Sequence, residues 1–196
     1  MTRRVLKMAV GALVALALGG GVFVGTAAAA YPPTVFPPPP APPRNDLFVN
    51  AAVLSPTPTV FPISPVAGVI RYATAERGEP AHGNVGASHS VWYQWRAPRS
   101  GLVEFNTCNS HFDTLLGVYA APPAGVNPLW NGVGSVAQND DASPSGYCGA
   151  NSLVLNSRVT FPATAGTTYR IAVDGFLAEG FDNTGAFFLN YKYVTV

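Results

Sequence analysis

Four side chains with oxygen donors offer the clearest chemistry in this sequence. Asn139, Asp140 and Asp141 are consecutive, and Asp113 directly precedes residues 114–119, a predicted strand that we expect to neighbour this turn. Calcium prefers several carboxylate and carbonyl oxygens in a flexible loop, so these four residues are candidate calcium ligands. Alternatively, Asp and Asn side chains cap turns by accepting hydrogen bonds from nearby backbone N–H groups. The spacing matches no EF-hand loop, and both interpretations stay open.

A second candidate group consists of aromatic residues outside the predicted strands or at their ends. It comprises Trp130, Tyr147, Phe176 and Phe181. Exposed rings of this kind can stack on sugars and form a platform for a polysaccharide. The alternative is local packing, because single exposed aromatic residues are common on protein surfaces.

The sequence contains no recognisable catalytic motif. Nucleophilic catalysis needs a Ser or Cys activated by His and oriented by a carboxylate, but GxSxG, SxxK and HExxH are all absent. His82 and His89 belong to a Gly-rich connection around residues 78–88, which predicts solvated loop positions, and His111 is expected in a turn. We therefore expect no enzymatic activity, with an unrecognised hydrolase as the alternative, since triads also assemble from residues distant in sequence.

Composition and the amino terminus predict an exported protein. Residues 1–30 begin with Arg3, Arg4 and Lys7, continue with an uncharged apolar stretch and end in small residues, which is typical of a cleaved signal peptide. An uncleaved membrane anchor is the alternative. Cleavage removes three of the 11 basic residues and leaves 8 against 10 acidic ones. This balance lacks the excess of Lys and Arg that a nucleic-acid-binding protein needs, and we expect no stable membrane insertion after cleavage.

The remaining chain divides into a linker and one domain. Residues 31–43 are dominated by proline and predict an extended polyproline II spacer, with a docking motif for an aromatic groove as the alternative. Residues 44–196 are long enough for a single core, and they contain most of the aromatic residues.

The domain is predicted to be all-β. Its apolar runs are short, separated by Gly, Pro, Asn and Asp, and none longer than about ten residues has a clear helical period. The sequence predicts strands at 51–54, 66–73, 90–95, 101–107, 114–119, 129–137, 158–161, 167–174 and 186–195. Residues 167–174 and 186–195 alternate like half-buried strands, with one face in the core. Without helical crossovers we expect antiparallel pairing in a two-sheet, jelly-roll-like β-sandwich of about eight or nine strands.

Cys108 and Cys148 are the only cysteines, and both lie in the part predicted to be exported. An even count in an oxidising compartment makes one disulfide the default, which closes a loop with 39 residues between its ends. Neither cysteine belongs to a CxxC motif that would indicate a redox or zinc site.

Seven short segments occur in an order typical of one family. They are NDLF (45–48), ATAERGEP (73–80), SVWYQWRAP (90–98), FDTLL (112–116), NDD (139–141), AGTTY (165–169) and IAVDG (171–175). In these segments the chain resembles the bacterial pre-peptidase C-terminal domain, a secreted β-sandwich module. The resemblance implies a non-catalytic accessory role and a bond between Cys108 and Cys148. It also implies that Trp92 and Trp95 are mainly core residues and that calcium is a ligand in parts of the family.

The sequence therefore predicts a secreted binding module. We expect it to serve at the cell surface, with an extracellular polysaccharide or protein as its partner and with calcium as the one candidate cofactor. The alternatives are a structural envelope protein without a specific ligand and the unrecognised secreted hydrolase. Because β-sandwiches have many functions, only a defined site separates these possibilities.

Overall fold

The computed structural model describes residues 38–57, 65–120, 134–142, 147–148, 155–177 and 183–195. Contacts divide the chain into residues 1–38 and a compact unit of residues 39–196. The predicted signal peptide, residues 1–30, lies outside the described residues, as does the linker up to residue 37. Within the described ranges, no helix combines the length and apolar character needed to cross a membrane.

The described residues form one short 3₁₀ helix, η1 (Phe48–Asn50), and nine strands. The strands are β1 (Ala52–Val53), β2 (Val66–Val69), β3 (Val91–Arg96), β4 (Gly101–Asn106), β5 (Thr114–Ala120), β6 (Ser135–Asn139), β7 (Arg158–Ala163), β8 (Thr168–Gly175) and β9 (Ala186–Tyr193). Each strand overlaps one of the nine predicted ranges. The assignment of strands from the sequence is therefore confirmed.

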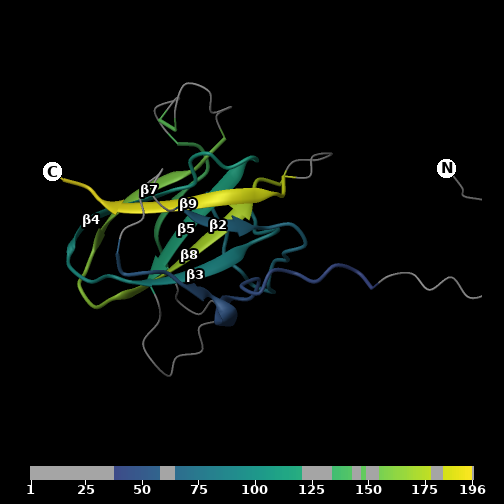
Figure 1. Ribbon diagram of the computed structural model, residues 1–196, viewed down its shortest axis with the longest axis horizontal. Coiled ribbons are helices and arrows are strands. Elements are labelled where there is room, and N and C mark those ends of the chain that lie inside the picture. The colour runs from purple at the N-terminus through teal and green to yellow at the C-terminus, as the bar shows by residue number, and fades with distance from the viewer. Residues whose placement is uncertain are drawn as a thin grey trace, which may run out of the picture. The chain divides into compact units, whose positions relative to one another are not determined.

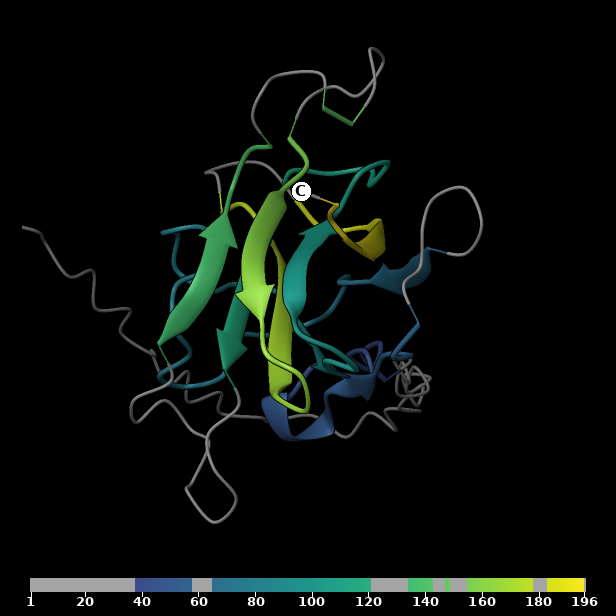
Figure 2. The ribbon, with the colours of Figure 1, turned by 90° about the vertical axis from the view of Figure 1, so that its left-hand side faces the viewer.

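The nine strands form two sheets, which Figures 1 and 2 show from directions 90° apart. One sheet has the order β1-β3-β8-β5-β6 and the other has the order β2-β9-β4-β7. Strands β2 to β9 pair as nested antiparallel couples: β5 with β6, β4 with β7, β3 with β8 and β2 with β9. In a jelly roll, one long antiparallel hairpin is rolled up so that its nested strand couples form two sheets. The strand couples here follow this arrangement, and the predicted fold class is confirmed.

The edge strand β1 departs from the expected antiparallel pairing. Ala52 and Val53 pair in parallel with Tyr93 and Gln94 of β3. A parallel neighbour requires a long connection, and residues 54–90 supply it because they pass through β2 in the opposite sheet.

The main core fills the space between the two sheets. Alternate residues of β8 and β9 point into it, among them Tyr169, Ile171 and Val173 from β8 and Phe187 and Leu189 from β9. All five are at least 96% buried, so the predicted inward faces of these two strands are confirmed.

The outer face of β8 is also covered, although the alternation predicted only one buried face. Ala172 belongs to a second apolar cluster with Phe48, Trp92 and Tyr119. The ring centroids of Phe48 and Trp92 lie 5.0 Å apart in an edge-to-face arrangement. Trp92 and Trp95 are both fully buried, but Trp95 belongs to the main core and Trp92 to this outer cluster.

The predicted disulfide between Cys108 and Cys148 is present. Cys108 lies two residues after the end of β4, and Cys148 belongs to the short described segment 147–148. The chain-entropy model assigns about 4 kcal/mol of stability to a closed loop of this length.

Gly68 on β2 is a position where the fold tolerates no side chain. A Cβ atom there would lie 2.3 Å from Cζ of Phe187 and 2.7 Å from the hydroxyl oxygen of Tyr93, and both rings are held in the core. We expect Gly68→Ala to lower the free energy of unfolding by about 1–3 kcal/mol through overpacking. The matched control is Gly86→Ala, whose Cβ atom would meet nothing within 4 Å. Equal denaturation midpoints for the two variants would contradict this prediction.

Candidate functional site

Strand pairing brings the predicted acidic residues to one end of the five-stranded sheet. Asp113 directly precedes β5, whereas Asp140 and Asp141 directly follow β6. Because β5 and β6 are antiparallel, with Leu116 opposite Asn139, the start of one strand meets the end of the other. The carboxyl end of β8 joins them, since the backbone N–H of Phe176 donates to the carbonyl oxygen of Asp113 at 3.0 Å.

Three aspartates converge at this point. Each of Asp113, Asp140 and Asp141 offers a carboxylate oxygen, and these oxygens lie within 4.8 Å of one another. Asp113 and Asp140 are half-buried and Asp141 is exposed. The Oδ1 atom of Asp113 is inaccessible to solvent and has no hydrogen-bond partner in the described part of the chain. We call these three residues the acidic cluster.

Mutual repulsion and burial destabilise the charged form of the acidic cluster. Burial, together with the charges of Asp140 and Asp141, raises the pKa of Asp113 to about 6. Burial and the charge of Asp141 also raise the pKa of Asp140. At neutral pH the cluster therefore holds negative charge that a bound cation or a proton would stabilise.

Among the described residues, the alternative interpretation, turn capping, is observed for Asn139. Oδ1 of Asn139 accepts a hydrogen bond of 2.9 Å from the backbone N–H of Arg158, which ties the end of β6 to β7. No described residue donates a hydrogen bond to the carboxylate of Asp113, Asp140 or Asp141. The four predicted ligands thus divide into one amide with a structural role and three carboxylates that accept no hydrogen bond from the described residues.

A tight turn packs against the backbone of the acidic cluster. His82 and Val85 exchange backbone hydrogen bonds of 2.8 and 2.9 Å around Gly83 and Asn84, which have φ values of +58° and +68°. A Cβ atom on Gly83 would lie 3.0 Å from the carbonyl oxygen of Asn139, so glycine permits this close approach. The Gly-Asn pair is a recognised hairpin signal in sequences, and it could have revealed this turn.

His82 is fully buried, so the prediction of a solvated loop position was wrong for this residue. Its Nδ1 atom lies 2.7 Å from the hydroxyl oxygen of Tyr119, and its Nε2 atom lies 3.0 Å from Oε1 of Glu79. The ring also packs edge-to-face on Trp92, at 5.5 Å between centroids. The Gly-rich composition indicated a loop correctly, but it carried no information about the sheet face that the loop covers.

The polar array around His82 does not have the geometry of a hydrolase. The hydroxyl of Ser90 donates to Glu79, so it contacts the carboxylate rather than the imidazole that would have to remove its proton. Ser90 and His82 are both fully buried, and the Glu79 side chain is 1% exposed. These contacts anchor the loop on the sheet instead of presenting a nucleophile to a substrate.

The other two histidines stand apart from this array. His89 is half-buried, and its backbone N–H donates to Oδ1 of Asp174 at 2.7 Å. His111 is exposed in the bend before β5, as the sequence predicted. Neither histidine belongs to the acidic cluster.

The candidate aromatic platform is described only in part, because Trp130 and Phe181 lie outside the described residues. The Tyr147 ring lies under the guanidinium of Arg158, at 4.1 Å from its centroid, and the hydroxyl donates to Glu104 at 2.5 Å. Phe176 is half-buried next to the acidic cluster. Tyr147 therefore has local packing partners, whereas the Phe176 side chain is partly buried.

No family model and no curated protein matches this chain. Among solved structures, the pre-peptidase C-terminal domain of a collagenase from Bacillus anthracis matches with 12% identity and a TM-score of 0.37, covering 66% of this chain and 88% of that one. A surface-associated copper-binding protein of Methylomicrobium album BG8 matches with 10% identity and a TM-score of 0.39, covering 74% and 98%. One neighbour thus comes from the family that the sequence resembles. At these TM-scores, neither transfers a ligand or an activity to this chain.

The raised pKa of Asp113 predicts a measurable pH effect. A carboxyl group whose pKa is higher in the folded state contributes stability below its unfolded pKa, and this contribution is lost as the pH rises through about 6. In a chelator at pH 7.5, Asp113→Asn should therefore raise the melting temperature by about 2–4 °C, a value reduced for the solvent screening of a half-buried group. The gain should shrink as the pH falls towards 4. A variant that melts below the parent at pH 7.5 would contradict the repulsion.

Proposed function

We propose that this chain is a secreted, non-catalytic binding module in which the acidic cluster holds a calcium ion. The observation that carries this proposal is the convergence of Asp113, Asp140 and Asp141 without hydrogen-bond donors from the described residues. A site of three adjacent carboxylates is repulsive by itself, and a divalent cation converts that repulsion into attraction. The resemblance of the sequence to secreted accessory modules supports the same role.

The donor set favours calcium over softer metals. All three donors are carboxylates, and among the described residues no histidine or cysteine joins them. Hard oxygen ligands suit calcium, magnesium and manganese, whereas copper and zinc favour nitrogen and sulfur. Calcium accepts irregular coordination completed by carbonyl oxygens and water, and an open cluster of three aspartates fits this requirement better than the strict octahedral geometry of magnesium.

The role of such an ion would be structural support for a binding surface. It would join the start of β5 to the end of β6, beside the turn at Gly83 and the end of β8. Extracellular modules commonly bind calcium with dissociation constants of about 10⁻⁴–10⁻³ M, a range suited to a protein outside the cell. The partner that we propose is an extracellular polysaccharide or protein at the cell surface.

Calcium titration tests this function. Because only the folded state assembles the cluster, millimolar calcium should raise the melting temperature of the full chain over that in a chelator. Asp140→Asn removes one of the three donors and should abolish most of the increase. Magnesium at the same concentration should give a smaller shift.

The matched control removes a negative charge elsewhere. Glu76 accepts a hydrogen bond of 2.6 Å from the backbone N–H of Phe48, and it is not part of the acidic cluster. Glu76→Gln should leave the calcium-induced increase intact, because this side chain lies outside the acidic cluster. Identical midpoints in chelator and in calcium for the parent chain would refute the metal site.

A further inference from the structure

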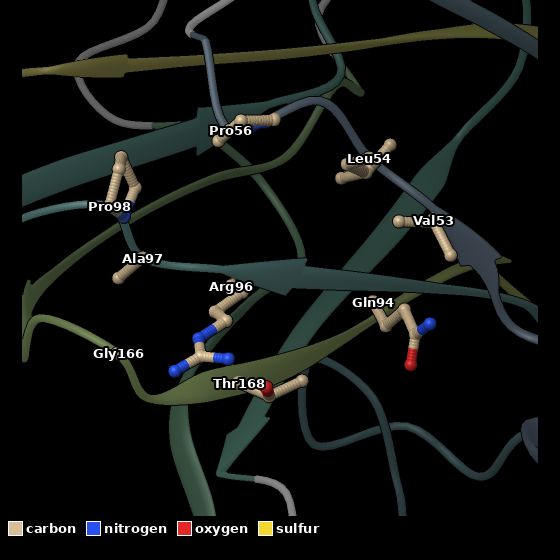
Figure 3. A pocket seen from close by; sticks show the side chains of 9 residues that line it. All are labelled: Val53, Leu54, Pro56, Gln94, Arg96, Ala97, Pro98, Gly166 and Thr168. Carbon is tan, nitrogen blue, oxygen red and sulfur yellow. The ribbon is translucent and has the colours of Figure 1, made fainter.

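A pocket of about 540 Å³ lies beside β1, β3 and β8, well separated in sequence from the acidic cluster. Its polar lining comes from Gln94 and Arg96 of β3 and Thr168 of β8. Figure 3 shows Arg96 and Gln94, two positions apart on one strand, extending to the same side of β3, with Thr168 beside Arg96. Val53, Pro56 and Pro98 contribute aliphatic surface to the opposite part of the lining.

The polar groups of this pocket converge because of the strand register. Arg96 is directly opposite Thr168, and Gln94 is directly opposite Arg170. Directly opposed residues share a face of the sheet, and residues two positions apart on a strand share it too. Guanidinium, amide and hydroxyl groups are therefore held together on the outer face of the five-stranded sheet.

Arg96 is a cation without a counter-ion in the described part of the chain. Its side chain is exposed, its guanidinium forms no ion pair or hydrogen bond with any described residue, and the described pocket lining contains no Asp or Glu. The guanidinium lies beside Gly166, where a Cβ atom would be 3.6 Å from Nη2. Arg170 places a second positive charge on the next row of the same face, although it packs over the ring of Phe48 at 4.7 Å. The pocket thus offers positive charge and hydrogen-bond donors to an anion.

The neighbouring edge of the sheet offers backbone groups as well. β1 is an edge strand in this sheet, and the N–H of Leu54 donates to the carbonyl oxygen of Gln94 at 2.9 Å. In a parallel ladder, backbone groups alternate in direction, so the N–H and C=O of Val53 point away from β3. No described strand pairs with this edge, and the Val53 side chain is 76% exposed.

We propose that this pocket binds an extended peptide segment of an extracellular protein through a carboxylate. The proposal rests on the proposed role as a binding module and specifies its partner as a protein. Arg96 would hold the carboxylate in a two-point contact, with Thr168 and Gln94 donating further hydrogen bonds. The peptide backbone would extend the sheet along Val53 by strand addition.

The lining favours a peptide over an acidic sugar. The apolar lining residues that the structure describes are all aliphatic or proline, and none of them has an aromatic ring on which a sugar could stack. Side chains two positions apart on an extended peptide share a face, so one aliphatic side chain would rest on Val53 and Pro56 while the carboxylate reaches Arg96. The expected motif is an acidic residue two positions from an aliphatic one.

Nuclear magnetic resonance titration of the full chain tests this proposal. The probe is the peptide acetyl-Thr-Val-Thr-Asp-Val-Thr-amide, and its matched control carries Asn in place of Asp. The Asp peptide should shift the backbone amides of Val53, Gln94 and Thr168 and the Nε–H signal of Arg96, and it should bind at least tenfold more tightly than the Asn peptide. Raising the salt concentration should weaken the interaction.

Variants assign the effect to the pocket. Arg96→Gln should weaken binding of the Asp peptide at least tenfold, and Arg96→Lys should give an intermediate affinity because it keeps the charge and loses the two-point contact. Arg77→Gln removes an exposed charge outside the pocket lining and should have no effect. Unchanged melting temperatures confirm that the variants are folded.

Three results would overturn the proposal. They are equal affinity for the Asp and Asn peptides, absence of shifts at millimolar peptide, and preferential binding of hexagalacturonate, which would assign the pocket to an acidic polysaccharide. Titrations in chelator and in calcium separate this pocket from the metal site. A calcium-induced melting shift without peptide binding refutes the pocket alone, whereas peptide binding without that shift refutes the metal site alone.

Discussion

Hydrogen bonds from backbone N–H groups to buried carboxylates hold the loop that covers the outer face of the five-stranded sheet. Asp174 is fully buried on β8 and accepts hydrogen bonds from the backbone N–H groups of Ser88 and His89 at 2.9 and 2.7 Å. Glu79 accepts from the backbone N–H of Glu76 at 2.7 Å and contacts the imidazole of His82. Charged acceptors form hydrogen bonds roughly twice as strong as neutral ones, so a few of them fix a loop that has little regular structure. The connection between β2 and β3 is thereby held against the sheet.

The anchored loop packs against the backbone beside the acidic cluster and against the outer apolar cluster. With the loop in place, the ring of His82 packs on Trp92, and the turn at Gly83 lies against the backbone of Asn139. The amino-terminal segment is fixed in the same manner, since Asp46 accepts hydrogen bonds from the backbone N–H and the hydroxyl of Thr74. The array of His82, Glu79 and Ser90 has the residue types of a catalytic site, but its contacts hold the loop against the sheet. The acidic cluster and the pocket at Arg96 are two places where charged groups contact no opposite charge among the described residues.

Local sequence patterns predicted the strands and the acidic cluster. The burial of His82 and the pocket at Arg96 depend instead on contacts between segments distant in sequence. Apolar runs bounded by turn residues located all nine strands, and the expectation that Asp113 neighbours Asp140 was confirmed because antiparallel neighbours bring those strand ends together. The burial of His82 could not be predicted, because a Gly-rich segment looks the same in sequence whether it lies on a sheet or in solvent. The pocket at Arg96 depends on the register that places Thr168 opposite this residue. No local pattern in the sequence encodes that register.

The nested order of the strands also determines when the domain can become complete. The innermost couple, β5 with β6, joins segments close in sequence, but the outermost couple pairs β2 with β9 at the other end of the chain. Loop-closure entropy grows with the separation of the paired segments, so the inner couples can form first and β9 closes the four-stranded sheet last. Cys108 and Cys148 both precede β9, and their bond can therefore form on a partly assembled chain. β9 lies between β2 and β4 in the four-stranded sheet. Before residues 186–193 are synthesised, the edges of β2 and β4 that pair with β9 are therefore exposed in the nascent chain.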